Sequence, residues 1–316
     1  MRIILAPMEG VLDHIMRNIL TEIGDYDLCV TEFIRVVDQL LPERVFYRTC
    51  PELKYAGKTD SGTPVRVQLL GQHSDYMAEN ALRAIELGSQ GIDLNFGCPS
   101  PTVNKNKGGA VLLKEPETIY KIIKAVRDAV PNDNIVSAKI RLGYEDKKLV
   151  YEVADAVESA GANELTIHAR TKLEGYKPPA HWDWIGKVKE KVSIPVIANG
   201  EIWSFDDYNK CKSRSNCSDF MVGRGALAVP NLSQVLKFNN QPLAWKNVNE
   251  LLLKYTKQET YGDKSKYYPN RIKQWLRYLK IQYLEADELF TAIRRFKTTE
   301  EIVDKIEDAR KTKHDA

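Results

Sequence analysis

One cysteine stands where a thiol could take part in chemistry. Cys98 directly follows the short apolar run IDLNFG and lies between Gly97 and Pro99, which restrict the local backbone. A thiol with an unperturbed pKa of about 8.5 is mostly protonated near pH 7. Cys98 could therefore act as a general acid, or as a nucleophile if its surroundings lower its pKa. The alternative is that it packs as a small apolar residue.

Two cationic positions lie inside or at the end of apolar runs. Lys139 lies within SAKIRLG, and His168 ends the run ELTIH. A buried, unpaired ammonium is costly, so Lys139 must face an anion or pair with a carboxylate. Arg170 follows His168 by two residues and is expected on the same face, although His168 alone could be a core histidine. We expect both Lys139 and His168 to face a ligand.

Two glycine-containing segments have the composition of phosphate-binding turns. IANGEI and VGRGAL each place small residues between an apolar run and a helical segment. Backbone N–H groups in such turns can approach a phosphate closely, and Arg224 could add a bidentate contact. A simple strand-to-helix turn is the alternative reading. Because the two turns follow neighbouring late runs, we expect them to bind a phosphate together.

Eight apolar runs position these residues, and amphipathic segments separate most of them. Both faces of each run are apolar, as in buried parallel strands. Helical spacing is clear at 76–88, 116–130 and 148–161, whereas 35–64 reads as an irregular insertion. The alternation predicts a (β/α)8 TIM barrel with its site at the C-terminal ends of the strands, and an open doubly wound sheet is the rival fold. The runs are RIILAP, LCVTEF, VRVQLLG, IDLNFG, VSAKIRLG, ELTIHAR, IPVIANG and DFMVGRG.

The composition changes after NNQPLAW (239–245). No strand pattern follows, and the remaining helical segments predict a bundle, so we place 1–241 in the barrel and 242–316 in a helical domain. From residue 243 onward there are 16 Lys and Arg against 12 Asp and Glu, so the first 242 residues carry a net −1 of the chain's +3. The predicted helices are WKNVNELLLKYTKQE, NRIKQWLRYLKIQYLEA, ADELFTAIRRF and TEEIVDKIEDARK.

The segment 264–280 concentrates this positive charge and contains no acidic residue. Ile272, Leu276, Leu279 and Tyr283 fall on one helical face that is suited to packing, and the stripe beside it holds Lys273, Arg277 and Lys280. A solvated helix face is the simpler explanation of such a stripe. The neighbouring Trp275 and Tyr278 favour contact with nucleic acid instead.

The bulk composition excludes several classes of protein. With 43% hydrophobic and 28% charged residues, the chain reads as soluble and globular. No apolar run reaches about 18 residues, and the apolar stretch before Pro7 is too short for a signal peptide, so we expect a cytoplasmic protein without membrane contact. We expect no disulfide framework and no metal site, because no Cys-x-x-Cys pair occurs among Cys29, Cys50, Cys98, Cys211 and Cys217.

Taken together, the motifs resemble the tRNA-dihydrouridine synthases, over nearly the whole chain. The segments APMEG, VQLLG, DLNFGCPS, KIRLG, HARTK, VIANGEI and VGRGAL carry this resemblance, and TEFIRVVDQLLP and RIKQWLRYL are similar to the bacterial C subfamily. The resemblance implies an FMN enzyme that uses NADPH to reduce the C5=C6 bond of a D-loop uridine in tRNA, at position 16. In this reading the target base is extruded, hydride reaches C6 from FMN, and Cys98 protonates C5.

The resemblance also implies roles for individual residues. Residues expected at the cofactor are Pro7, Met8, Glu9, Gln68, Lys139, His168, Asn199, Gly200, Glu201, Gly223 and Arg224. Residues expected at the uridine or elsewhere on the tRNA are Arg35, Asn95, Arg141, Arg271, Lys273, Trp275, Arg277, Lys280 and Arg295. The segment 104–110 is expected to be a mobile basic loop that closes over the substrate, and a monomer is expected.

Two other functions remain open at the level of sequence. An FMN barrel reductase of a small molecule, similar to dihydroorotate dehydrogenase, would explain the strand ends but not the basic helical segments. A tRNA-binding or tRNA-folding module would explain the basic helices but needs no thiol, lysine or phosphate turns.

Overall fold

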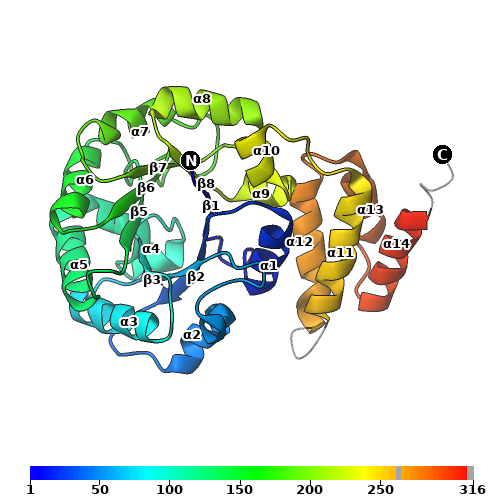
Figure 1. Ribbon diagram of the computed structural model, residues 1–316, viewed down its shortest axis with the longest axis horizontal. Coiled ribbons are helices and arrows are strands. Elements are labelled where there is room, and N and C mark those ends of the chain that lie inside the picture. Colours follow the sequence, from blue (N-terminus) through cyan, green and yellow to red (C-terminus); the bar gives the residue numbers. More distant parts are fainter. Residues whose placement is uncertain (261–264, 312–316) are drawn as a thin grey trace.

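The fold is a closed barrel of eight parallel strands, as the sequence predicts (Figure 1). The structure, a computed structural model, describes residues 1–260 and 265–311. Each strand pairs with the next in sequence, and β8 closes the ring against β1, where Ile4 lies opposite Met221. The strands are β1 Ile3–Leu5, β2 Leu28–Arg35, β3 Val65–Leu70, β4 Ile92–Asn95, β5 Val136–Arg141, β6 Glu164–His168, β7 Val196–Asn199 and β8 Asp219–Val222.

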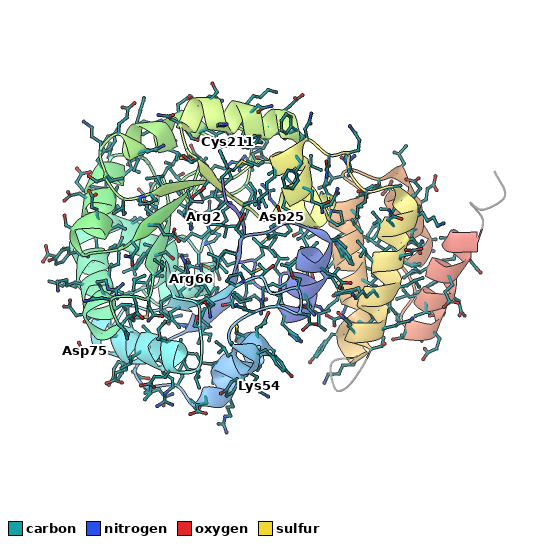
Figure 2. All side chains as sticks on the ribbon, viewed as in Figure 1. Arg2, Asp25, Lys54, Arg66, Asp75 and Cys211 are labelled. Atoms are coloured by element: carbon teal, nitrogen blue, oxygen red, sulfur yellow. The ribbon has the colours of Figure 1, made fainter. Side chains whose placement is uncertain are left out.

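Burial on both faces explains why these runs are strands. Every residue of β3 is buried, because its outward side chains pack under helices and its inward side chains fill the barrel. The interior also holds charge: Arg66 of β3 is buried, whereas Arg2, just before β1, is partly exposed. Figure 2 labels both near the centre of the ring of strands and labels Lys54 and Asp75 at the periphery. The barrel is therefore a packed core whose polar residues need specific partners.

Helices surround the closed ring of strands (Figure 1). The helices at 76–88, 116–130 and 148–161 that the sequence predicts correspond to α3, α5 and α6. The helices up to residue 238 are α1 His14–Ile23, α2 Glu43–Thr49, α3 Ser74–Glu86, α4 Pro101–Lys105, α5 Pro116–Ala129, α6 Val150–Ser159, α7 Trp182–Lys189, α8 Phe205–Ser215, α9 Arg224–Ala228 and α10 Leu232–Phe238. Two 3-10 turns, η1 Pro51–Tyr55 and η2 Gly109–Lys114, interrupt the loops.

Two segments are more ordered than the sequence suggests. The stretch 35–64 contains α2 and η1, and the buried Arg17 of α1 holds it in place through a bidentate pair with Glu52, at 2.8 and 2.9 Å. The stretch 104–110, expected as a loop, contains the end of α4 and the start of η2. In both segments, buried contacts supply the order that local sequence periodicity does not indicate.

Four helices follow the barrel and pack beside it: α11 Trp245–Glu259, α12 Tyr268–Leu279, α13 Leu284–Ile293 and α14 Thr299–Lys311, with η3 Ser265–Tyr267 before α12 (Figure 1). The segment 270–286, expected as one helix, ends its first helix at Leu279 and begins α13 at Leu284. Ile272, Leu276, Leu279 and Tyr283 are all buried, which confirms the predicted packing face. Within the described ranges, no helix is both long and apolar enough to span a membrane.

Candidate active site

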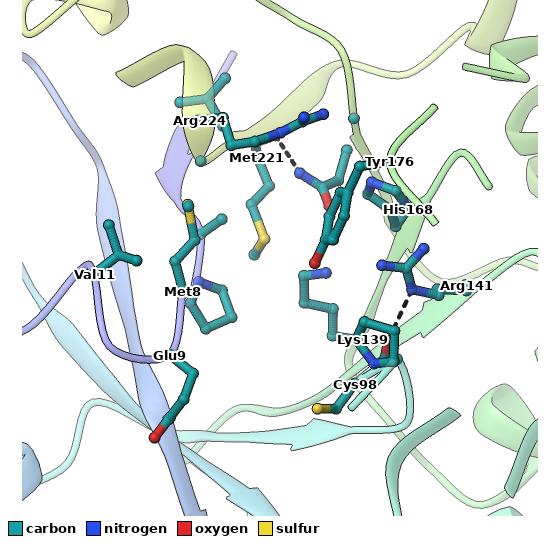
Figure 3. Close-up of a pocket in the computed structure, with 18 of the residues that line it drawn as sticks. Met8, Glu9, Val11, Cys98, Lys139, Arg141, His168, Tyr176, Met221 and Arg224 are labelled. Carbon is teal, nitrogen blue, oxygen red and sulfur yellow. Dashed lines mark hydrogen bonds between the residues drawn. The ribbon is translucent and has the colours of Figure 1, made fainter. Parts of the chain in front are cut away.

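A cavity of about 450 Å³ opens where the C-terminal ends of the strands meet (Figure 3). All residues that the sequence places at a cofactor, together with Cys98, Asn95 and Arg141, line it. They are Pro7, Met8, Glu9, Gln68, Asn95, Cys98, Lys139, Arg141, His168, Asn199, Gly200, Glu201, Gly223 and Arg224. They converge because parallel strands of a closed barrel present all their C-terminal ends at one rim.

Cys98 is the cysteine that faces this cavity. It is half-buried, whereas the other four cysteines are buried free thiols. Burial raises the pKa of Cys98, and Glu9 raises it further, while a hydrogen bond from the Ser100 backbone and the charges of Arg141 and Lys139 act in the opposite direction. The sulfur therefore keeps its proton at neutral pH, which suits a general acid better than a nucleophile.

The loop that carries Cys98 is fixed by Asn95 and by a close glycine. Asn95 Oδ1 accepts hydrogen bonds from the backbone N–H groups of Gly97 and Cys98, each at 2.9 Å. Gly109 has a φ of +66° and passes so close that an added Cβ would lie 2.9 Å from the Cys98 carbonyl oxygen. The loop that carries the thiol is therefore held in place by side-chain and backbone contacts, and Asn95 accepts two of its hydrogen bonds.

Lys139 and Arg141 bring positive charge to the cavity wall from β5. Burial, reinforced by Arg141, lowers the pKa of Lys139 to about 8, and the opposing influence of Asp93 and Cys98 does not offset this. Arg141 is also buried, and its guanidinium donates to the carbonyl oxygens of Gly97 (2.8 Å), Thr171 (3.1 Å) and Gly175 (2.9 Å). An anionic or strongly polar ligand beside Lys139 would stabilise its charged form.

His168 lies at the same wall and is neutral. Its pKa is well below the usual value because the ring is buried and because Arg141, Lys139, Arg170 and Arg224 are nearby. Its Nδ1 is buried and has no hydrogen-bond partner among the described residues. Because the imidazole lines the cavity, a polar ligand bound there would lie beside the ring. Arg170, expected on the same face, instead points behind the cavity, pairs with Glu201 and donates to the Lys177 carbonyl at 2.7 Å.

The two glycine-containing turns, which follow the neighbouring strands β7 and β8, lie side by side and both line the cavity. Gly200 and Glu201 both have positive φ values, +114° and +59°, and Asn199 Nδ2 bridges to the Met221 carbonyl at 2.8 Å. An added Cβ on Gly223 would lie 2.9 Å from Met8 Sδ, so a side chain there would crowd the cavity. Arg224 lies 3.5 Å from the Glu201 carboxylate. The turns thus combine open backbone with an arginine, as a phosphate group requires.

Two aromatic residues at the cavity are not apparent from the sequence. Tyr176 stacks between Arg141 and Arg224, at 5.1 and 4.9 Å from its ring centre, and is half exposed (Figure 3). Tyr278 reaches the cavity from α12, beyond the barrel. Tyr176 follows the HARTK motif by a few residues, a signal that could have indicated it. Tyr278 could be found only from the packing of α12 against α9.

The residues expected at the tRNA separate into exposed and buried groups. Arg35 is exposed at the C-terminal end of β2, on the rim of the barrel, and the exposed members beyond the barrel are Arg277, Lys280 and Arg295. Lys273 is half-buried and donates to the Phe296 carbonyl at 2.5 Å. The preceding Lys264 lies outside the described residues.

The expected tRNA contact of Trp275 is wrong, because its side chain is buried inside the molecule, and Arg271 is partly exposed but engaged in ion pairs. Trp275 is 1% exposed, and its Nε1 donates to the Leu227 carbonyl of α9 at 3.2 Å. Arg271 pairs with Asp13 at 2.7 Å and Glu259 at 2.9 Å, and donates to the Tyr255 hydroxyl at 3.0 Å. These two residues dock α12 onto the barrel and onto α11.

Comparison with known proteins agrees with this geometry. The family model described as dihydrouridine synthase (Dus) matches residues 4–314. A protein of Shewanella oneidensis named tRNA-dihydrouridine(16) synthase is 60% identical over 309 residues, which are 98% of each chain. A protein of the same name from Escherichia coli K12 is 56% identical over 296 residues, covering 93% of this chain and 94% of its own.

Solved structures share the fold at low sequence identity. The old yellow enzyme homologue of Zymomonas mobilis superposes with a TM-score of 0.55 at 11% identity, covering 77% of this chain and 90% of its own. The structure titled TcOYE with pHBA gives 0.54 at 14% identity, covering 76% and 90%. These likenesses support the barrel architecture alone. The family match over nearly the full length is decisive: this chain belongs to the dihydrouridine synthase family.

Proposed function

We propose that this protein reduces the C5=C6 bond of a uridine in tRNA to 5,6-dihydrouridine, with FMN as cofactor and NADPH as reductant. The observation that carries the proposal is the protonated thiol of Cys98 in a cavity of the size and polarity of a cofactor site. Family membership supplies the reaction class, and the relatives that share more than half of the sequence are named for position 16 of tRNA. We therefore propose position 16 as the target.

The cavity fits FMN in three respects. The turns at Gly200 and Gly223 leave open backbone beside Arg224, which suits a phosphate. Neutral His168 lines the cavity, which suits a polar ribityl or phosphate oxygen. Lys139 and Gln68 supply N–H donors from β5 and β3 for the carbonyl edge of the ring system, and Met8 supplies an apolar wall. When bound, FMN supplies the hydride for C6 of the uracil.

The residues of the chain supply the proton and the positioning. Cys98 holds a proton on Sγ and donates it to C5 of the uracil. Negative charge that develops on the uracil carbonyl is stabilised by the remaining N–H of Asn95 and by Arg141, whose orientations are fixed by hydrogen bonds to the same loop. Tyr176 and Tyr278 narrow the cavity mouth and exclude water.

The helices after the barrel support tRNA as the substrate. We propose that residues 1–241 form the catalytic domain and that 242–316 form the tRNA-recognition domain. Exposed Arg277 on α12, Lys280 directly after it and Arg295 after α13 offer charge to phosphates, although Lys280 also pairs with Asp287 at 2.8 Å. Arg35 offers charge from the barrel rim. Tyr278 belongs to the same helix and lines the cavity, so a tRNA held by α12 would lie at the cavity mouth. Reduction of a small molecule would not require basic helices beside the cavity mouth.

The test is reduction of unmodified tRNA transcripts by the purified protein with FMN and NADPH. We expect dihydrouridine at position 16, mapped by mass spectrometry of nuclease fragments, and none in a transcript whose uridine 16 is replaced by cytidine. A matched transcript with a cytidine at another D-loop uridine should still be modified. Reduction of free uridine or orotate at the rate seen with tRNA, or modification at a different position, would contradict the proposal.

A further inference from the structure

A chain of hydrogen bonds inside the barrel ends at the loop that carries Cys98. Asp93, one layer below Asn95 on β4, is buried, and its Oδ2 accepts from Gln68 Nε2 at 2.6 Å. Gln68 Oε1 accepts from Asn95 Nδ2 at 2.7 Å. Asn95 Oδ1 then accepts from the N–H groups of Gly97 and Cys98. The thiol loop is therefore connected to Asp93 through two side-chain amides.

Donors also reach Asp93 from the opposite side. Arg66 Nη1 donates to Ser137 Oγ at 3.0 Å, and Ser137 donates in turn to Asp93 Oδ1 at 2.6 Å. An arginine can only donate and an ionised carboxylate can only accept, whereas an amide or a hydroxyl can do both. Asp93 is the acceptor on which both halves of the chain converge. Its two accepting oxygens fix which way each intermediate group points.

We infer that Asp93 is a positioning residue for the proton transfer: it orients Gln68 and Asn95 so that Asn95 presents its carbonyl to the Cys98 loop and an N–H to the cavity. This inference rests on the proposed function for its effect on catalysis. The effect on the loop follows from the hydrogen bonds alone. With Gln68 and Asn95 so oriented, the remaining N–H of Asn95 is a donor, which complements a carbonyl oxygen of uracil.

Asp93→Leu tests the inference because it keeps the branched shape of the side chain and removes both acceptor oxygens. Ser137 can turn its proton to the Ile92 carbonyl, which lies 3.3 Å away, but the Gln68 N–H group loses its acceptor. Gln68 and Asn95 are then no longer fixed in one orientation, and the Asn95 carbonyl holds the loop N–H groups less well. We expect the Cys98 loop to be released while the fold remains.

Two measurements follow this release. Iodoacetamide should alkylate Cys98 about threefold faster than in the wild type, read by mass spectrometry of the flavin-loaded protein, because the other four cysteines are buried. Dihydrouridine formation by the reduced, flavin-loaded protein, measured per bound flavin, should slow about tenfold. The alkylation needs no tRNA, so it tests the inference even if the proposed substrate is wrong.

Ser137→Ala is the matched control. It removes a hydrogen bond from the same buried carboxylate but leaves that carboxylate as the acceptor for Gln68, so alkylation and product formation should stay within about twofold of the wild type. Equal behaviour of the two variants would overturn the inference. Thermal unfolding of both variants reports any general loss of stability separately.

Discussion

Burial acts on two groups of the cavity in opposite directions. It raises the pKa of the Cys98 thiol and lowers the pKa of Lys139 to about 8, so each is driven toward its neutral form. For the thiol, the neutral form is the one that donates a proton. For Lys139, the charged form is the one that can attract a carbonyl oxygen of the flavin, and the pKa that sets its population depends on the neighbouring groups. The protein alone thus keeps Cys98 protonated, whereas Lys139 carries its charge below about pH 8 and a polar ligand beside it would extend that range upward.

The affinity for FMN should therefore fall as the pH rises through the pKa of Lys139. Below about pH 8 the ammonium is present and attracts the carbonyl edge of the flavin, and above it this attraction is lost. Because the ligand itself stabilises the charge, the observed midpoint should lie at or above about 8. Fluorescence quenching of FMN by the apoprotein, measured between about pH 6.5 and 9.5, gives the dissociation constant at each pH.

Lys139→Met is the informative variant for this dependence. It should bind FMN about tenfold more weakly at neutral pH and should lack the decline at high pH. Lys121→Met, at an exposed position of α5, should behave as the wild type. A wild-type affinity that stays constant across the range would show that Lys139 does not carry the charge that we assign to it.

Replacement of Cys98 by alanine separates the two halves of the reaction. The variant should bind FMN and be reduced by NADPH as the wild type is, but dihydrouridine formation should fall by about 100-fold or more, because the proton donor is gone. In the wild type, the raised pKa means that the thiol keeps its proton at neutral pH and that product formation declines only above the ordinary thiol range, about 8.5. Rapid mixing of the reduced protein with tRNA, followed by flavin absorbance, measures this step. Undiminished product formation by the alanine variant would remove Cys98 from the mechanism.

At the scale of elements, the barrel is readable from the sequence because its strands are buried on both faces. Runs such as VRVQLL remain apolar without alternation, and β3 is accordingly buried throughout. Their C-terminal ends then assemble the predicted residues without further information. The buried polar chain below the site is not readable in this way. Gln68 and Asp93 are 25 residues apart, and only the register of β3 against β4 makes them neighbours.

The helix α12 shows where prediction from helical periodicity alone fails. Its basic residues look like one solvated stripe, but α12 packs against α9, α11, α13 and α14, so most of its faces are covered. Arg271 consequently meets Asp13 and Glu259, and Trp275 meets α9. Helical periodicity gives the angle of a side chain around its own axis. It does not give which neighbours occupy that angle.

Trp275 should therefore matter for stability and only indirectly for tRNA. Trp275→Ala should lower the free energy of unfolding by about 3 kcal/mol, because the indole is fully buried between α12 and the barrel. Trp275→Phe keeps most of the volume and loses the hydrogen bond to Leu227, so about 1 kcal/mol is expected. Urea denaturation of both variants measures these values. A stable Trp275→Ala protein with weakened tRNA binding would instead restore the surface role.

At the scale of the whole molecule, α12 connects the barrel with the face proposed for tRNA. Arg271 reaches Asp13, which caps α1 directly after the cavity loop that contains Met8 and Glu9. Tyr278, two turns further along, reaches the cavity itself. The exposed cations of the same helix face outward. A nucleic acid bound to those cations would be held in fixed register with the cavity, because a single rigid helix carries both sets of contacts.

Charge reversal at Arg277 and Lys280 tests this arrangement. Arg277→Glu combined with Lys280→Glu should weaken tRNA binding about tenfold or more, because contacts to phosphates are lost. Each lost contact should also reduce the slope of log affinity against log salt by about 1. Lys273 is a poorer target, because it is half-buried and its ammonium bonds the Phe296 carbonyl just after α13, whereas Arg277 and Lys280 are exposed. The control is Lys121→Glu with Lys124→Glu, an equal change of net charge at exposed positions of α5 on the barrel wall. Filter binding across a salt series should show a reduced slope for the α12 variant alone, with NADPH oxidation by the bound flavin unchanged in both. If the two variants lose affinity equally, net charge rather than the α12 surface holds the tRNA, and the proposed role of the helices fails.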